Sequence, residues 1–325
     1  MSTNALHLAD RTLLRIPAGQ APQDSWLADS APIQFTTTVP KEFVHRAALA
    51  EVLLTGGERH DDTRFDVTAQ WPRSHSFYSP IEGRHDPLLI AETIRQVGFL
   101  LLHTEFSVPL GYQFLLRTFT MSVQPEHLHV GHAPADLGIE VTFSDPDPRR
   151  DLGSAGRYDA VVRRDGVTVA TGGLSYTCIT PRAYRRLRSN QGHVHIPLTA
   201  PVQPQSVGRV FPNDVVLSPT GAENRWQLRV DTRHPVLFDH PVDHVPGMAL
   251  CEAVRQAATA TLGCDKILPV RMETDFSKYV ELDAPCFIEA VRLPSDAQGD
   301  VVQVIGVQDG QETFRAHITA VPAAS

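Results

Sequence analysis

Stretches with the apolar and polar pattern of β-strands recur in both halves of the chain. In the first half they are Phe114–Val123, Gly138–Phe143, Tyr158–Arg163 and Val167–Thr177. In the second half they are Pro269–Val280, Cys286–Val291, Val301–Val307 and Glu312–Ala320. The dipeptides Asp165-Gly166 and Asp309-Gly310 each stand between two such stretches. An Asp-Gly pair between two apolar runs is a strong signal for a hairpin, so each half is predicted to contain antiparallel strands.

Ahead of these strands, each half shows a short strand, a long loop and one helix. The short strands are expected at Ala50–Leu54 and Val215–Leu217, and the loops at Trp71–Pro87 and His234–Pro246. A helix is predicted to begin at about Pro87 and at about Pro246, because proline suits the first helical turn. The residues that follow are mostly apolar, which predicts that both helices are buried.

The two halves also share sequence. Glu92-Thr-Ile-Arg95-Gln96 recurs half a chain later as Glu252-Ala-Val-Arg255-Gln256. Upstream, Val44-His-Arg46 recurs as Val207-Gly-Arg209. Such self-similarity predicts a duplicated structural unit.

The fold class predicted from these patterns is α+β, with two tandem domains. A central helix followed by an antiparallel meander is the order of a hot-dog domain, in which a curved sheet wraps the helix. We expect an N-terminal tail or arm at residues 1–30, domains at 31–185 and 206–325, and a linker at 186–205. Arginine, proline and glutamine are frequent over Arg182–Gly208, which favours a linker there. Two α+β domains of another type are the alternative.

Composition narrows the function classes. The chain has 325 residues and a net charge of −8, so it lacks the overall basic field that would favour nucleic-acid binding. Its 4 cysteines show no CxxC spacing, which predicts reduced thiols and a cytoplasmic protein. No secretory pattern precedes the domains, and the longest apolar run, Val97–Leu102, is too short to span a membrane.

The repeated helix motif places charge on a buried helix. Residues at i, i+3 and i+4 share one helix face, so Glu92, Arg95 and Gln96 lie together, as do their counterparts in the second half. A surface Glu–Arg pair, worth about 0.3–0.5 kcal/mol, is the simplest explanation. Because the motif is repeated, we favour a functional or subunit-interface role.

The second helix is preceded by a histidine-containing loop. His240 and His244 lead into Pro246-Gly247, and Glu252 follows on the second turn of the helix. This segment resembles the active-site segment of the β-hydroxyacyl-acyl-carrier-protein dehydratases. Free N–H groups near Gly247 would polarise a thioester oxygen. The loop is shorter than in the dehydratases, and the first half has Leu88 after Pro87 instead of glycine. We therefore expect a reaction other than dehydration, and a better-formed site in the second half.

Several segments together resemble the A-factor-synthase family. They are Val39–Arg46, Ala50–Thr55, Glu92-x-x-Arg95-Gln96 and Phe238–Met248. The resemblance implies two hot-dog repeats and an acyltransferase that needs no cofactor or metal. Such an enzyme moves a β-ketoacyl group from acyl carrier protein to a hydroxyl of dihydroxyacetone phosphate. The ester then cyclises toward a butenolide, the precursor of γ-butyrolactone, furan or butenolide signals.

The resemblance also implies roles for individual residues. Glu252 would deprotonate or position the hydroxyl, with His240 or His244 as a second proton carrier. Glu92, from the other repeat, would help to hold phosphate or to order the shared pocket. The expected substrate-binding residues are Arg255, Arg95, Gln256, Gln96, Gly247, Arg46, Arg117 and Arg271. Arginine suits phosphate because its planar group donates paired hydrogen bonds.

Some alternatives stay open at the level of sequence. The protein would otherwise be a hot-dog dehydratase or thioesterase, or a non-catalytic module that binds acyl groups or lactones. Direct transfer is favoured over an acyl-enzyme on Cys251, but both remain. Arg182, Arg185, Arg186 and Arg188 form a basic run that is either a solvated linker or a docking site for an acidic carrier protein. Monomer and homodimer are both open, as is the length of the acyl chain.

Overall fold

The computed structural model describes residues 37–144, 153–189 and 196–323. The predicted tail at 1–30 and positions 190–195 of the predicted linker lie outside these ranges. The first half contains β1 (Leu54–Arg59), β2 (Arg64–Trp71), α1 (Pro87–Thr104), β3 (Gln113–Val123), β4 (Ala135–Ser144), β5 (Ala155–Arg164) and β6 (Val167–Ile179). Then come α2 (Pro181–Leu187), β7 (Leu217–Pro219), β8 (Arg225–Leu228), α3 (Gly247–Leu262), β9 (Ile267–Phe276), β10 (Cys286–Asp296), β11 (Gly299–Gln308) and β12 (Gln311–Pro322).

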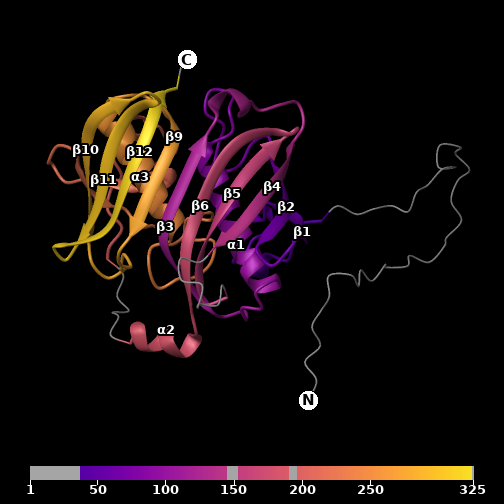
Figure 1. Ribbon diagram of the computed structural model, residues 1–325. Helices are drawn as coiled ribbons and strands as arrows, with labels where there is room; N and C mark the ends of the chain where they lie inside the picture. Colours follow the sequence, from indigo (N-terminus) through magenta and orange to yellow (C-terminus); the bar gives the residue numbers. More distant parts are fainter. Residues whose placement is uncertain (1–36, 145–152, 190–195, 324–325) are drawn as a thin grey trace, which may run out of the picture. The chain divides into compact units, whose positions relative to one another are not determined.

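The described strands form one 12-stranded antiparallel sheet, in the order β1-β2-β4-β5-β6-β3-β9-β12-β11-β10-β8-β7. This order has the same pattern from either edge, with β3 and β9 as the central pair (Figure 1). Met121 lies opposite Met272 in that pair, and both are buried. The two halves are therefore related by a twofold pattern and share one sheet.

Helices α1 and α3 lie against the concave side of this sheet (Figure 1). Helix α1 begins at Pro87, and α3 begins directly after Pro246, as the proline positions predicted. Gly98 on α1 allows close packing, because a Cβ there would lie 2.5 Å from the ring of Tyr158. The Tyr158 hydroxyl donates a 2.7 Å hydrogen bond to the Ile94 carbonyl, which fixes the helix to β5.

The eight predicted strands after the helices are confirmed as β3–β6 and β9–β12. Their alternation is clearest in β4, where every second residue is buried. Both predicted hairpins are also present. Asp165 and Gly166 have φ of 51° and 78°, and Asp309 and Gly310 have 52° and 70°, as a type I′ turn requires.

The prediction of a strand at Ala50–Leu54 is wrong. A 3-10 helix covers Leu49–Glu51, and β1 begins only at Leu54. The Gln96 side chain accepts from the Leu53 amide at 3.0 Å and donates to the Glu51 carbonyl at 2.7 Å. These two backbone groups therefore bond to a side chain and not to a neighbouring strand. Gln256 binds the Val216 amide and the Asp214 carbonyl in the same way, and β7 begins at Leu217.

Strands β2 and β8 and helix α2 were not predicted. Strand β2 alternates strictly between exposed and buried residues, so its pattern was readable. Helix α2 lies partly within the stretch that the composition marked as a linker. The predicted domain boundaries stay predictions.

Candidate active site

The repeated Glu-Arg-Gln motifs form two buried ion-pair clusters. In the first, Glu92 accepts from Arg46 at 2.7 Å, from Arg95 at 2.8 Å and from Gln96 at 2.6 Å. In the second, Glu252 accepts from Arg209 at 2.8 Å, and from Arg255 and Gln256 at 2.5 Å each. Glu92 is 1% exposed and Glu252 is fully buried. Each cluster therefore satisfies its carboxylate within the protein.

Arg209 is a residue that the analysis of the sequence missed. It occupies the place in the second cluster that Arg46 occupies in the first. The signal was present, because Val207-Gly-Arg209 repeats Val44-His-Arg46.

The clusters also connect the two halves. Arg46 donates to the Val236 carbonyl at 3.0 Å, and Arg209 donates to the Phe77 carbonyl at 2.8 Å. Each of these carbonyls belongs to the long loop of the opposite half. The exchange is reciprocal, so the two arginines hold the halves together.

Both central glutamates are ionised. Burial raises the pKa of Glu92, but Arg46 and Arg95 outweigh it and lower that pKa to about 2. Burial likewise opposes ionisation of Glu252, and Arg209 with Arg255 outweighs it, so that its pKa is lowered as well. Carboxylates with such low pKa values are weak proton acceptors near neutral pH. Catalytic roles for Glu92 and Glu252 stay predictions, and this geometry favours a structural role.

A cavity of about 650 Å³ lies between the two halves. Six predicted residues line it: Arg46, Arg95, Arg117, His240, His244 and Gly247. The described residues that line the cavity do not include the glutamates, glutamines and second arginine of the repeated motifs, which are Glu92, Glu252, Gln96, Gln256 and Arg255. Arg271 is also absent; it is about half exposed on β9 and pairs with Glu273. The structure thus separates the predicted residues into a cavity group, two buried clusters and one surface arginine.

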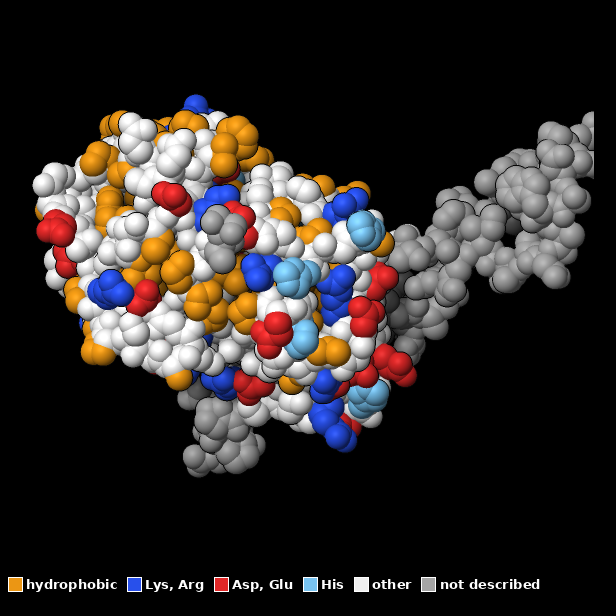
Figure 2. Space-filling model, turned by 90° about the horizontal axis from the view of Figure 1, so that it is seen from above, with side chains coloured by type: hydrophobic (Ala, Val, Ile, Leu, Met, Phe, Trp, Pro, Cys, Tyr) orange, Lys and Arg blue, Asp and Glu red, His pale blue; other side chains and the backbone are white. Residues whose placement is uncertain are grey.

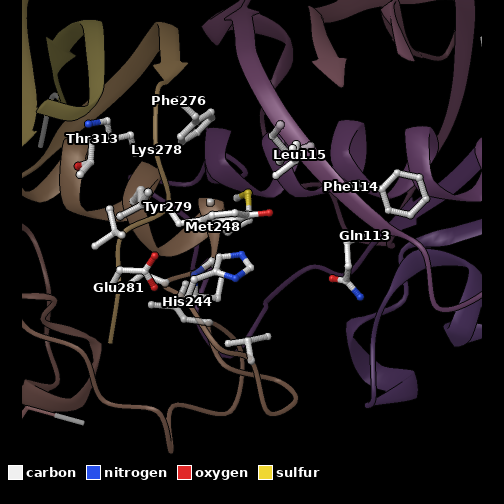
Figure 3. A pocket seen from close by; sticks show the side chains of 18 of the residues that line it. Gln113, Phe114, Leu115, His244, Met248, Phe276, Lys278, Tyr279, Glu281 and Thr313 are labelled. Atoms are coloured by element: carbon white, nitrogen blue, oxygen red, sulfur yellow. The ribbon is translucent and has the colours of Figure 1, made fainter. Parts of the chain in front are cut away.

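His244 points into this cavity, beside Met248 (Figure 3). Its Nδ1 lies 2.8 Å from the Asp243 carboxylate, which also accepts from Tyr184 at 2.6 Å and from Arg188 at 3.1 Å. The hydrogen bonds from His244 and Tyr184, with the charge of Arg188, hold the pKa of Asp243 below its usual range. Because an ionised carboxylate only accepts hydrogen bonds, Nδ1 of His244 donates to Asp243, and Nε2 is the ring nitrogen that can act as an acceptor in the neutral ring.

His240 is held less firmly. Its Nδ1 lies 3.7 Å from Asp239, and its side chain is 44% exposed. The Asp239 carboxylate instead accepts from the backbone amides of Ala47 and Ala48. Of the two predicted histidines, His244 has the better defined orientation.

The N-terminus of α3 opens at the same cavity. Pro246 is the N-cap residue and supplies no capping side chain, and Pro246, Gly247 and Met248 line the cavity. The first amide groups of a helix have no partner within the helix and carry a partial positive charge. Such amide groups are chemically suited to a negatively charged oxygen.

Counted by direct ion pairs, the two clusters differ in the ratio of arginines to carboxylates. Glu92 faces two guanidinium groups, those of Arg46 and Arg95. The second cluster also has two, but it holds two carboxylates, because Arg255 pairs with both Glu252 and Asp86. The surplus positive charge lies in the first cluster, whose two arginines line the cavity.

His45 is a further cavity residue that the analysis of the sequence did not single out. Its Nε2 lies 2.9 Å from Nε2 of His103, whose Nδ1 lies 2.7 Å from the Val108 carbonyl. Burial lowers the pKa of His45 to about 3, and His103 and Arg95 act in the same direction. His45 is therefore neutral at physiological pH. Its signal was its place in the Val39–Arg46 motif.

Neither a metal site nor a membrane span is found in the part of the chain that the structure describes. No group of three or more His, Cys, Asp or Glu side chains there is placed to hold a metal ion. No described helix is both long and apolar enough to cross a membrane.

Comparison with known proteins adds the evolutionary setting. The family described as "A-factor biosynthesis hotdog domain" matches residues 27–180 and 193–322. A Streptomyces virginiae protein named 2-oxo-3-(phosphooxy)propyl 3-oxoalkanoate synthase is 51% identical over 282 residues, covering 86% of this chain and 96% of its own. A Streptomyces griseus protein of the same name is 44% identical over 278 residues, covering 84% and 92%.

A solved structure shares the architecture. It is that of the 12:0-ACP thioesterase from Umbellularia californica, with a TM-score of 0.51 and 13% identity. The match covers 82% of this chain and 99% of the thioesterase. At this identity the likeness concerns the fold alone. Together with the two matched family segments, it confirms the predicted tandem hot-dog fold.

Proposed function

The chain belongs to the A-factor biosynthesis hotdog family, and on this premise we propose that it transfers a β-ketoacyl group from acyl carrier protein to dihydroxyacetone phosphate. The relatives' name describes an ester of a 3-oxo acid with a phosphorylated three-carbon ketone. Dihydroxyacetone phosphate supplies that alcohol, and a thioester supplies the activated acyl group. The predicted membership in this family is confirmed.

The observation that carries the proposal is the cavity that His244 lines together with the first residues of α3, with His244 beside Met248. An acyl transfer needs a base for the hydroxyl proton and donors for the oxygen that becomes negative. His244, oriented by Asp243, supplies the base at Nε2. The first amide groups of α3 supply the donors.

The chemical step follows from these positions. The hydroxyl oxygen attacks the thioester carbonyl carbon while His244 accepts the hydroxyl proton. The amide groups of α3 stabilise the oxyanion of the tetrahedral intermediate. When the intermediate collapses, the carbon–sulfur bond breaks and His244 returns the proton to the leaving sulfur. The products are the keto ester and a free thiol, so atoms and protons balance.

The same cavity offers separate places for phosphate and acyl chain. Arg95 belongs to the cluster with surplus positive charge, and Arg117 lies exposed on β3 at the cavity wall. Both are arginines that the family resemblance assigned to substrate binding. Phe114, Leu116 and Phe276 supply an apolar surface for the chain (Figure 3 labels Phe114 and Phe276).

Direct transfer is the simpler route. The candidate for an acyl-enzyme, Cys251, is buried, and burial raises its pKa to about 12. Cys251 is not one of the described residues that line the cavity. A thiol that stays protonated is a poor nucleophile.

The test is a mass-spectrometric assay with purified protein, β-ketoacyl carrier protein and dihydroxyacetone phosphate. The expected product is the phosphorylated keto ester, and His244→Gln should lower kcat by about 10²–10⁴-fold. His240→Gln is the matched control and should retain most turnover. Free β-keto acid with unused acceptor would identify a thioesterase instead, and an untouched donor would favour a binding module.

A further inference from the structure

Helix α2 is fixed beside the cavity by Arg188, the residue that follows it as its C-cap. The Arg188 side chain, which is 7% exposed, binds Glu281 at 2.6 Å and the Asp243 carbonyl at 2.6 Å. Its guanidinium also lies 4.5 Å from the centre of the Tyr279 ring. Leu187 and Arg188 line the cavity. Helix α2 is therefore held at the cavity opening, and it is attached to the same Asp243 that orients His244.

The outer side of α2 carries unpaired positive charge. Arg182, Arg185 and Arg186 are exposed, and none has an ion pair with a described residue. They stand at i, i+3 and i+4, so they share one helix face. Leu187 beside them is 58% exposed.

Two exposed arginines on the sheet, by contrast, have acidic partners. Arg163 pairs with Glu140 and Arg271 pairs with Glu273. On the face seen in Figure 2, basic and acidic side chains are interspersed. In a chain with a net charge of −8, three exposed arginines on one helix face, none of them ion-paired with a described residue, form a local basic patch.

We propose that α2 is the docking site of the acyl carrier protein and binds an acidic face of that protein. This inference rests on the proposed function, which requires a carrier-bound donor. The three arginines are exposed and are spread over residues 182–186 of a helix of 7 residues. An extended acidic surface matches that arrangement better than a single small anion does. Docking there brings the thioester arm to the cavity opening, next to Leu187.

The test compares two donors that carry the same β-ketoacyl group. One is the carrier protein, and the other is a pantetheine thioester, which lacks the protein. The triple variant R182E/R185E/R186E should raise the KM for the carrier donor at least about tenfold and leave the KM for the pantetheine donor unchanged. Added salt should raise the KM of the wild-type protein for the carrier donor and should change the KM of the variant little.

The matched control is R64E/R163E/R292E. It changes the net charge equally, at exposed arginines outside the cavity lining. It should leave both KM values near those of the wild type. An unchanged carrier KM in the α2 variant overturns the proposal. So does an equal rise of the KM values for the carrier and pantetheine donors.

Binding of the fluorescently labelled carrier protein, measured by anisotropy, separates this proposal from the proposed function. If wild-type protein transfers from neither donor, the function fails. Carrier binding that is lost in the α2 variant and retained in the control still supports docking. Equal binding by all three proteins overturns it.

Discussion

The two helix N-termini are equivalent in the repeat but opposite in character. Asp86 stands six residues before Glu92, and Pro246 stands six residues before Glu252. Asp86 caps α1 by accepting from the Leu88 amide at 2.8 Å, and it binds Arg255 of the other half at 2.6 Å. Pro246 caps nothing, and its helix opens at the cavity. One of two equivalent positions is closed by an ion pair, and the other is open.

Because of this difference, the two arginines of the repeated motif have different ion-pair partners. Arg255 shares its charge between Glu252 and Asp86. Arg95 has Glu92 and the Val44 carbonyl, and it lines the cavity. A duplicated fold can therefore keep both clusters for stability while one pocket is free to bind substrate. The two states differ because the first half has Asp86 at the position where the second half has Pro246.

The variant Pro246→Asp would close the open end and should have the largest effect. The new carboxylate would accept from the first amides of α3 and repel a developing oxyanion. We expect kcat to fall about 10²-fold or more, while the helix gains about 1 kcal/mol from its cap. Steady-state kinetics and urea unfolding measure the two effects. Normal turnover in this variant would show that the α3 N-terminus takes no part in the reaction.

The two buried glutamates should differ in what their removal costs. Glu92→Gln leaves Arg46 and Arg95 without a carboxylate, whereas Glu252→Gln leaves Arg255 its partner Asp86. Breaking a buried pair typically costs about 3–5 kcal/mol of unfolding free energy, so Glu92→Gln should lie at the upper end. Denaturant unfolding measures both. If Glu252→Gln folds with unchanged stability but is inactive, Glu252 is the catalytic base that the resemblance implied.

Arg95→Met should act on the acceptor and spare the donor. The surplus positive charge beside the cavity is removed, so the KM for dihydroxyacetone phosphate should rise about tenfold. The KM of the acyl donor should change little. Arg255→Met is the comparison variant, and it should mainly reduce stability, because it leaves Glu252 and Asp86 short of a partner. Equal rises in both KM values for Arg95→Met would contradict a phosphate role.

Acid should destabilise the protein. Most of the loss of stability that comes from histidine protonation should arise in the first half. Burial lowers the pKa of His45 to about 3 and that of His85 to about 4. The unfolded chain binds these protons below about pH 6.5, so stability falls as pH drops from there toward the folded values. Glu92, with its pKa lowered to about 2, adds to the loss below about pH 4.5.

The measurement is the melting temperature between pH 7 and pH 4. The wild-type value should decline by several degrees, and His45→Gln should flatten the decline between pH 6.5 and pH 4. The second half has Gly208 in the place of His45, so it has no histidine at this position whose protonation could change the stability. A melting temperature that is independent of pH in this range would contradict the expectation.

The sequence by itself determined the local structure and the family. Apolar and polar patterns located the eight strands β3–β6 and β9–β12, Asp-Gly pairs located two hairpins, and proline located both helix starts. These features depend on neighbours in the chain, which a sequence displays directly. The motifs around His45–Arg46 and His240–Met248 indicated the family, which the matched segments confirm.

Only the tertiary structure decided which side chains face the cavity. Helical spacing places Glu252, Arg255 and Gln256 on one face, but a helix wrapped by a sheet is buried on every side. The direction of that face depends on partners distant in the chain, such as Arg209 and Asp86. Likewise, His244 gains its orientation from Asp243, Tyr184 and Arg188 after α2 has packed against the second half. Contacts of this kind arise when the chain folds, because they join residues that no local pattern connects.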